Sequence, residues 1–257
     1  MYTLLAKRAV ILWLLGVFLL SLLCIVPQFS RADILFEDDL EGGKLDTKKW
    51  NPKAEWQIIA PDPKLKSLGK GVLDFSTGEA NITIKNDFKD FVYEADFRAM
   101  NAGKITGFVF RAQDGNSNFY MHQISATGSG HTPNNMRWHW KVGGNWNVEP
   151  IPFFKGETVM PEIWYRARFV AEGFNFKSYV LETEEFEKNP RNAKMRQLGD
   201  WTDKSKSYTK GAIGFRASGG EHMQYDNVLV YDIGFDPFSV DPAGKLATTW
   251  GKLKTKQ

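Results

Sequence analysis

The stretch GFVFRAQD, residues 107–114, is followed after a short break by NFYMHQI, residues 118–124, and this pair is the strongest indication of the fold. In both runs apolar and polar residues alternate, which is the period of a β-strand with one face in a core. The break, GNS at residues 115–117, consists of turn-forming residues. The pair is therefore predicted to form a β-hairpin.

A third run, GAIGFRAS at residues 211–218, repeats the glycine–apolar–arginine pattern about a hundred residues later. Further strand-like runs lie at residues 34–37, 56–59, 72–75, 80–84, 91–99, 136–142, 163–171, 174–181 and 224–231. No amphipathic helix of ten or more residues interrupts them. Many short strands without intervening helices predict an all-β fold, a two-sheet antiparallel jelly-roll sandwich.

The first 32 residues predict a secretory signal peptide. Lys7 and Arg8 precede an apolar run over residues 9–26, and SRA at residues 30–32 offers small residues for cleavage before Asp33. The protein is thus expected to be exported to the cell envelope or the extracellular space. The run is long enough that an uncleaved membrane anchor is the alternative. The only cysteine lies inside it, so the exported part is expected to have no disulfide.

Residues 33–233 are predicted to form the jelly-roll domain, and residues 234–257 a linker-like tail. Residues 183–210 are charged and are predicted to be a long surface loop with a short helix near residues 184–188. Without the three basic residues of the signal, the chain carries 30 basic and 30 acidic residues. This balance argues against nucleic acid and against anionic membranes as partners.

Several motifs resemble the concanavalin A-like lectin/glucanase superfamily. LFEDDLEG at residues 35–42 resembles its first strand, and the hairpin of residues 107–124 resembles jelly-roll modules attached to bacterial glycosidases, including α-L-rhamnosidases. GAIGFR at residues 211–216 and YDNVLV at residues 225–230 resemble the closing strands of laminin-G-like and 3-keto-disaccharide hydrolase domains. The resemblance implies a concanavalin A-like jelly roll, a fold that hosts both binding proteins and enzymes.

The resemblance also implies a structural Ca²⁺ between the first and last strands. The matching candidates for its ligands are Glu37, Asp39 and Asp226. Calcium needs six to eight oxygen ligands, and the sequence offers only a few. The alternative is that these aspartates cap ordinary turns.

An enzyme of this type would need two carboxylates, and Glu94 with Asp96 form the best pair. Alternation along the strand of residues 91–99 predicts both on its outer face, about 6.6 Å apart. The superfamily's glucanases carry a third carboxylate two residues further on, where this chain has Arg98, which puts glucanase activity in doubt. The alternative is a solvated strand face with cross-strand ion pairs.

Alternation predicts that Phe108, Phe110, Trp138 and Trp140 point into the core, and that Arg137, His139 and Lys141 face outward. A binding function is favoured by the predicted outer faces of two strands, which carry Gly107 with Arg111 and Gly214 with Arg216. Arg111 and Arg216 can donate paired hydrogen bonds to a sugar or a carboxylate, or can pair with acidic side chains of the sheet. His122 is favoured over Gln123 as a third ligand-binding residue, and Trp146 is a candidate stacking platform.

These observations predict an exported, lectin-like domain that binds an oligo- or polysaccharide on the outer concave face of one sheet. Two alternatives stay open. One is a glycoside-cleaving enzyme similar to the 3-keto-disaccharide hydrolases, and the other is an adhesion or scaffold domain that does not bind sugar.

Overall fold

The computed structural model describes residues 33–51, 56–61, 68–75, 81–100, 105–126, 136–149, 159–217 and 221–238. The predicted signal peptide and nearly all of the predicted tail lie outside these residues. Within the described part of the chain, no helix is long and apolar enough to span a membrane.

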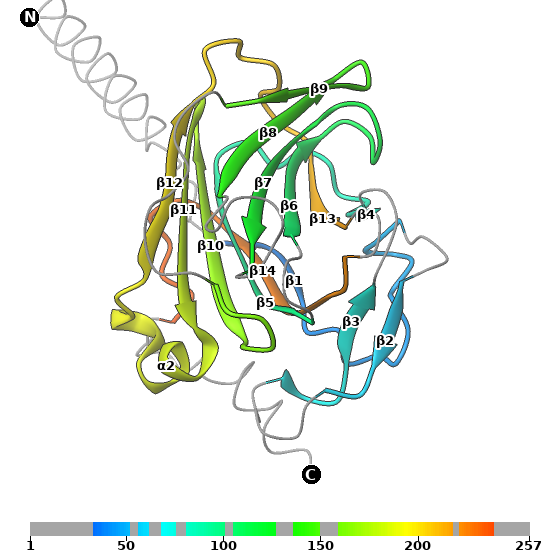
Figure 1. The fold of residues 1–257 in the computed structure, drawn as a ribbon, viewed down its shortest axis with the longest axis vertical. Helices are drawn as coiled ribbons and strands as arrows, with labels where there is room; N and C mark the ends of the chain where they lie inside the picture. Colours follow the sequence, from blue (N-terminus) through cyan, green and yellow to red (C-terminus); the bar gives the residue numbers. More distant parts are fainter. Residues whose placement is uncertain are drawn as a thin grey trace, which may run out of the picture. The chain divides into compact units, whose positions relative to one another are not determined.

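The described residues form two antiparallel sheets (Figure 1). The eight-stranded sheet has the order β12-β11-β10-β5-β14-β3-β2, and β1 also pairs with β14. Its strands are β1 (Ile34–Asp38), β2 (Gln57–Ile59), β3 (Val72–Phe75), β5 (Phe91–Ala99), β10 (Tyr165–Glu172), β11 (Asn175–Glu182), β12 (Arg196–Thr202) and β14 (Met223–Tyr231). The six-stranded sheet has the order β4-β13-β6-β7-β8-β9. Its strands are β4 (Asn81–Ile82), β6 (Ile105–Ala112), β7 (Phe119–Ser125), β8 (Arg137–Val142), β9 (Asn145–Val148) and β13 (Ala212–Arg216).

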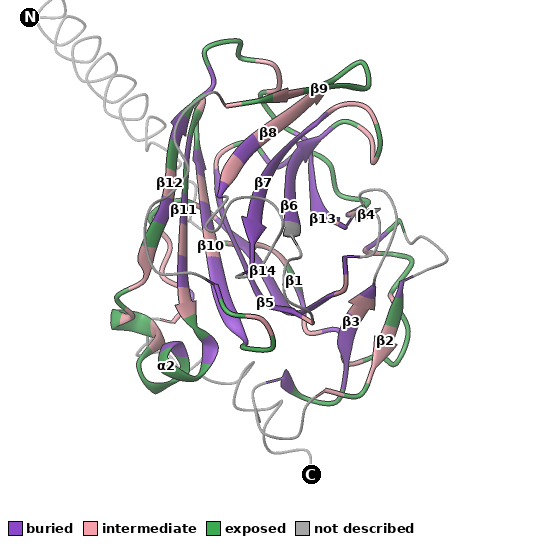
Figure 2. Cartoon of the chain, viewed as in Figure 1, coloured by how far each residue is buried: buried purple, intermediate pink, exposed green. Residues whose placement is uncertain are grey.

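An aromatic core holds the two sheets together, and the central strands β5, β7 and β14 are buried along their whole length (Figure 2). Phe108 of β6 lies at its centre, with its ring 4.6 Å from Phe169 of β10 and 5.5 Å from Tyr225 of β14. Alternation explains this arrangement, because every second residue of each strand points between the sheets. The predicted inward orientation of Phe108 and Phe110 is confirmed.

A short helix, α2 (Thr183–Lys188), lies at one end of β10 and β11 (Figure 1). Phe186 of α2 is buried, with its ring 5.4 Å from that of Phe238. Arg191, which follows the helix, pairs with Asp236 at 3.4 Å. The helix and residues 235–238 therefore pack together.

All twelve predicted strands and the short helix are present, and the sandwich fold is confirmed. Two strands, β9 and β12, were not predicted. In β12 the buried residues are Leu198 and Trp201, three positions apart. A register shift opposite Ser178 and Tyr179 breaks the alternation there, so the pattern does not resemble that of a strand. The predicted surface loop of residues 183–210 thus contains an edge strand of the larger sheet.

Candidate functional site

Polar and aromatic side chains cross the outer face of the six-stranded sheet in three rows, because residues paired across strands point the same way. The first row is Arg216, Gly107, Gln123 and Arg137, the second is Gly214, Val109, Met121, His139 and Val148, and the third is Phe119, Lys141 and Trp146. We call this surface the cationic face. No residue of these rows is acidic.

The sheet curves around the cationic face. Arg216 on β13 and Trp146 on β9 have three strands between them, which in a flat sheet is a separation of about 19 Å. Nevertheless, Arg216 Cζ lies 4.9 Å from the centre of the Trp146 ring. Lys141 Nζ lies 4.9 Å from the same ring centre. The side chains of β13 and β9 therefore meet across this face.

His139 lies among these cations and is neutral at physiological pH. Burial lowers the pKa of His139 to about 4, and the charges of Arg137 and Arg216 act in the same direction. The Trp146 ring meets the imidazole edge-on at 5.7 Å. His139 Nε2 is buried and has no hydrogen-bond partner among the described residues. The imidazole therefore has a hydrogen-bonding position that the described residues do not use.

Arg111 does not lie on the cationic face, so its predicted outward orientation is wrong. A register shift near Ala212 places an extra residue in β6, and Arg111 adopts a φ of +46°. This bulge turns the side chain inward, leaving it 1% exposed. Arg111 Nε and Nη1 donate to the Lys89 and Tyr208 carbonyls at 2.9 and 3.2 Å, and Nη2 lies 3.3 Å from Asp90.

His122 lies in the dry interior, so its choice over Gln123 as the outward residue is also wrong. Its side chain is 0% exposed, and Nε2 lies 3.1 Å from Ser178 Oγ on the opposite sheet. Burial lowers the pKa of His122 to about 3, with a further contribution from His139. Gln123 is the member of the pair that faces outward, because it is paired with Gly107 and Arg137.

Gly107 lies on the outer face as expected, but it does not leave the backbone open to a ligand. A Cβ at Gly107 would lie 2.4 Å from Met121 Sδ and 3.2 Å from the Arg216 carbonyl oxygen. The glycine therefore makes room for the Met121 side chain. This thioether and Phe119 form the apolar floor of the cationic face.

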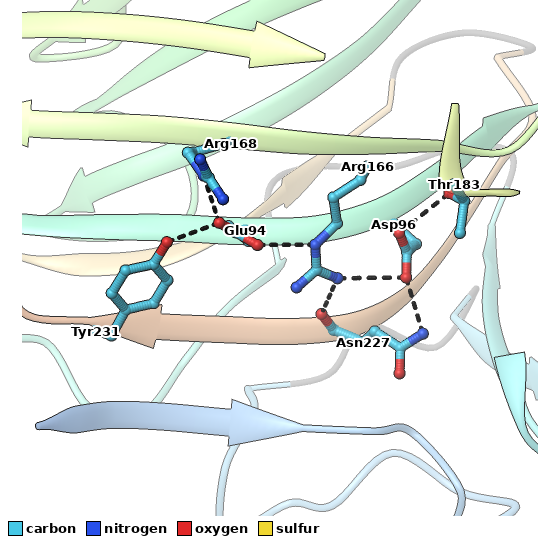
Figure 3. A network of polar contacts seen from close by, with 7 residues as sticks. All are labelled: Glu94, Asp96, Arg166, Arg168, Thr183, Asn227 and Tyr231. Atoms are coloured by element: carbon cyan, nitrogen blue, oxygen red, sulfur yellow. Dashed lines mark hydrogen bonds and ion pairs between the residues drawn. The ribbon is translucent and has the colours of Figure 1, made fainter. Parts of the chain in front are cut away.

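Glu94 and Asp96 point away from the core but are buried in an ionic network (Figure 3). Glu94 accepts hydrogen bonds from Arg166 at 2.9 Å and from Tyr231 at 2.7 Å, and also pairs with Arg168. Asp96 accepts from Thr183 at 3.1 Å and from the Asn227 side chain at 2.8 Å. The expected cross-strand ion pairs are present, but the expected solvated face is wrong.

The carboxyl groups of Glu94 and Asp96 stabilise the fold through contacts within the protein. Burial raises the pKa of Glu94, but Arg166 and Arg168 outweigh that effect and leave it below its ordinary value. Burial raises the pKa of Asp96, and Arg166 only partly offsets it. Because both oxygens of each carboxylate accept hydrogen bonds within the protein, the geometry offers a substrate no access to them.

The three predicted calcium ligands occupy different environments. Glu37 is exposed, Asp39 is half-buried and Asp226 is fully buried. Burial raises the pKa of Asp226 well above its ordinary value, and Asp96, Glu41 and Asp39 add to the effect. Within the described ranges, no three His, Cys, Asp or Glu side chains form a group that could hold a metal. Asp39 is close enough to Asp226 to raise its pKa, whereas Glu37 is not among the groups that act on Asp226.

Sequence reasoning placed Arg137, His139 and Lys141 on an outward face but did not assign them to the site. Alternation in β8 gives their direction. Their neighbours follow from the pairing of β8 with β7 and β9, which brings them beside Gln123 and Trp146. A correct prediction of this strand register would have identified these three residues as part of the site. Of the four ligand-binding candidates, the structure brings together Arg216 and Trp146.

A search of curated proteins gave no match. Among solved structures, a Bacillus subtilis protein with a galectin-like fold is similar at a TM-score of 0.53 and 15% identity, covering 77% of this chain and 96% of that one. The GH16 protein of the Bacteroides ovatus mixed-linkage glucan locus, solved with a product, is similar at a TM-score of 0.51 and 12% identity, covering 77% and 100%. Identities this low support the jelly-roll fold alone. The family model described as the 3-keto-alpha-glucoside-1,2-lyase-like domain matches residues 34–230, and the chain therefore belongs to that family.

Proposed function

We propose that this protein is an exported, saccharide-binding jelly-roll domain and that the cationic face is its binding surface. The observation that carries this proposal is the meeting of Arg216, Lys141 and Trp146 on the outer face of the six-stranded sheet. Guanidinium groups donate paired hydrogen bonds, and polar groups over an apolar floor are typical of ligand sites. The description of the family to which the chain belongs names a glucoside, which supports a sugar as the class of ligand.

The Trp146 ring is only partly available for stacking on a sugar, because two cationic side chains lie over it. It is 43% exposed, but Arg216 and Lys141 both lie over its ring. The indole therefore holds the two cations in place and offers its remaining surface to the C–H groups of a sugar. Gln123 and His139 add an amide and an imidazole to the hydrogen-bonding groups nearby.

A glycan array followed by titration calorimetry tests this proposal. We expect Trp146→Ala and Arg216→Gln to weaken saccharide binding about tenfold or more, since each removes a desolvated contact. Lys177→Gln is the matched control, because Lys177 is an exposed cation on β11 of the other sheet. If the purified protein binds no saccharide, the proposal fails and the scaffold alternative gains.

A second candidate function is cleavage of 3-keto-glucosides by elimination, and His139 is the observation that favours it. A neutral imidazole could take the proton from C2, which the neighbouring C3 ketone acidifies. The C–H electron pair would form the C1–C2 double bond as the C1–oxygen bond breaks, and the departing oxygen would take up a proton. Arg137 and Arg216 would stabilise the negative charge that develops on the ketone oxygen.

Incubation with a 3-keto-α-glucoside, read by chromatography, tests this second candidate. We expect His139→Gln to abolish turnover and Trp146→Phe to reduce it. Turnover that survives His139→Gln would contradict the assignment of the base. Turnover that is lost in Glu94→Gln, in a variant that is still folded, would restore the carboxylate pair as the catalytic candidates.

Export is proposed from residues 1–32 alone. Amino-terminal sequencing of the protein recovered from its native cells tests it, and an amino terminus at Asp33 is the expected result. Recovery of the intact amino terminus in the membrane fraction would favour the uncleaved anchor.

A further inference from the structure

We infer that Asp114 and Asn118 are positioning residues for the cationic face, and that they set the place of Trp146 without contacting the saccharide. This inference rests on the proposed function, because Trp146 belongs to the proposed binding surface. It is drawn from a chain of hydrogen bonds between two turns. One turn is formed by residues 113–118 between β6 and β7, and the other by Gly143 and Gly144 between β8 and β9.

The hairpin that carries Trp146 has little rigidity of its own. Gly143 and Gly144 form its turn with φ values of +57° and +83°, and glycine restricts the backbone less than any other residue. Among the described residues, β9 has four residues and pairs with β8 alone. The place of Trp146, two residues after this turn, therefore depends on what holds the turn.

Three hydrogen bonds of 2.8–2.9 Å join the β8–β9 hairpin to the turn between β6 and β7. They run from Lys141 Nζ to the Asn116 carbonyl, from the Gly143 N–H to Asn118 Oδ1 and from the Gly144 N–H to the Ser117 carbonyl. The two turns therefore form one unit, and a change in the first turn should move the second.

Asp114 fixes the conformation of the turn between β6 and β7. Its Oδ1 accepts the backbone N–H groups of Asn116 at 2.8 Å and Asn118 at 3.2 Å, and also that of Ser117. Burial raises the pKa of Asp114, but the N–H groups of Ser117 and Asn118 outweigh that effect and leave it below its ordinary value. The carboxylate is therefore ionised at neutral pH and orders the carbonyl groups that the β8–β9 hairpin meets.

The Asn118 side chain joins the two turns directly. Its Nδ2 donates to Asp114 Oδ2 at 2.7 Å, and its Oδ1 accepts the Gly143 N–H at 2.9 Å. The Tyr208 hydroxyl lies 3.1 Å from the same Oδ1 and 2.6 Å from the Lys141 carbonyl oxygen. An amide has one donor side and one acceptor side, so only one orientation of Asn118 suits both Asp114 and Gly143.

The chain of hydrogen bonds ends at side chains of the proposed binding surface. Trp146 is paired with Lys141 across β8 and β9. Lys141 Nζ and Arg216 Cζ each lie 4.9 Å from the centre of the Trp146 ring. A shift of the turn would move the ring away from these cations, and a ring that is not held in place must be ordered on binding, at a cost in affinity. Asp114 and Asn118 therefore affect binding through Trp146 and Lys141.

Exchanging the two side chains tests the inference. Asp114→Asn places an amide N–H against that of Asn118, and Asn118→Asp places two carboxylates together. Turning the Asn118 amide over in the first variant only moves the conflict to the Gly143 N–H. The double variant, Asp114→Asn with Asn118→Asp, restores a donor opposite an acceptor and keeps an acceptor for Gly143. Asp46→Asn is the matched control, because Asp46 accepts the Lys48 N–H at 2.8 Å in an exposed turn between β1 and β2.

Fluorine NMR of the protein labelled with 5-fluorotryptophan reports the place of Trp146 without any ligand, and Trp146→Phe identifies its resonance. We expect this resonance to shift or broaden in each single variant, to return in the double variant and to stay unchanged in Asp46→Asn. Binding to the glycan array should weaken about fivefold in each single variant, as expected for the loss of one hydrogen bond. It should recover to within about twofold of the parent in the double variant.

The outcomes separate this inference from the proposed function. A Trp146 resonance that stays unchanged in both single variants, or that the double variant does not restore, would overturn the inference. An equal change in the resonance of the buried Trp138 would show a general loss of structure and would also overturn it. If Trp146 moves but glycan binding does not weaken, the inference fails while saccharide binding stands. If the parent binds no glycan, the proposed function fails, and the spectrum alone decides whether Asp114 and Asn118 position Trp146.

Discussion

At Arg111 the backbone adopts a φ of +46°, a conformation that residues with a Cβ rarely adopt. Two effects compete at this position. The positive φ costs about 1 kcal/mol of conformational energy. The buried guanidinium offsets this cost by satisfying the Lys89 and Tyr208 carbonyls and by packing 5.2 Å from the Phe176 ring. Because the hydrogen bonds of a charged donor are strong, they outweigh the strain.

Substituting Arg111 by glycine and by alanine separates these two effects. Both variants lose the hydrogen bonds, so we expect each to lower the free energy of unfolding by about 2–4 kcal/mol. The glycine variant should be more stable than the alanine variant by about 1 kcal/mol, because glycine tolerates a positive φ. Urea unfolding of the three proteins measures the difference. An alanine variant as stable as the glycine variant would contradict the account of strain at this residue.

Asp226 is the most deeply buried of the three predicted calcium ligands. If a cation binds beside this buried carboxylate, millimolar Ca²⁺ should raise the melting temperature of the parent by several degrees relative to EDTA. Asp226→Asn should abolish that difference, while Glu37→Gln should retain it, because Glu37 is exposed and outside the acidic group. Equal melting temperatures of the parent in Ca²⁺ and in EDTA would refute the prediction.

At the scale of elements, β5, β10 and β14 are joined by charges as well as by backbone hydrogen bonds. Arg166 on β10 contacts Glu94 and Asp96 on β5 and donates to the Asn227 carbonyl on β14 at 2.9 Å. The α2 helix covers this arginine, with the Phe186 ring 5.4 Å from its Cζ. Removing one partner from this buried network should destabilise the protein, since an unpaired buried carboxylate is strongly unfavourable.

Arg166→Met should therefore lower the free energy of unfolding by about 3–5 kcal/mol. Lys188→Ala is the matched control, because Lys188 pairs with Glu185 across an exposed helix surface. Its loss should cost less than about 0.5 kcal/mol. Chemical denaturation of both variants measures the contrast, and equal effects would mean that burial does not set the energy of these pairs.

At the scale of the whole molecule, the two histidines of the six-stranded sheet predict instability in acid. In the folded state the pKa of His122 is about 3 and that of His139 about 4, both below the ordinary value of 6.5. Below pH 6.5 the unfolded chain binds protons that the folded protein does not. Stability is therefore lost as the pH falls from 6.5 toward these folded-state values.

For His122 alone the loss between pH 7.5 and 4.5 should be about 2–3 kcal/mol, because a tenfold change in proton affinity is worth about 1.4 kcal/mol. His122→Gln cannot titrate and should show a shallower fall over this range, even if it is less stable at pH 7.5. Urea unfolding at the two pH values, each compared with the parent, measures the slope. The same fall in both proteins would show that other groups dominate.

The amount that could be predicted differed between the fold and the site. Alternation gave twelve strands and the inward faces of Phe108, Phe110 and Trp138, because burial on one side of a strand leaves a period of two. It failed where a bulge interrupts the period, at Arg111 in β6 and at Leu198 in β12. Alternation also did not show which face of β7 points inward. His122 was therefore predicted to face a ligand, whereas Gln123 is the residue that lies on the outer face.

The all-β sandwich and its apolar interior follow from local sequence patterns, because the burial of one face of a strand imposes alternation on neighbouring residues. The pairs of charged side chains that meet depend on the tertiary structure. Arg216 and Trp146 lie 70 residues apart in sequence and come together because β13 and β9 belong to the same sheet and both side chains lie on its outer face. Arg166 contacts Glu94 and Asp96 for a similar reason, since the register of β10 against β5 places Arg166 opposite Asp96 and Arg168 opposite Glu94. Strand register and sheet curvature depend on long-range packing, which no local pattern records.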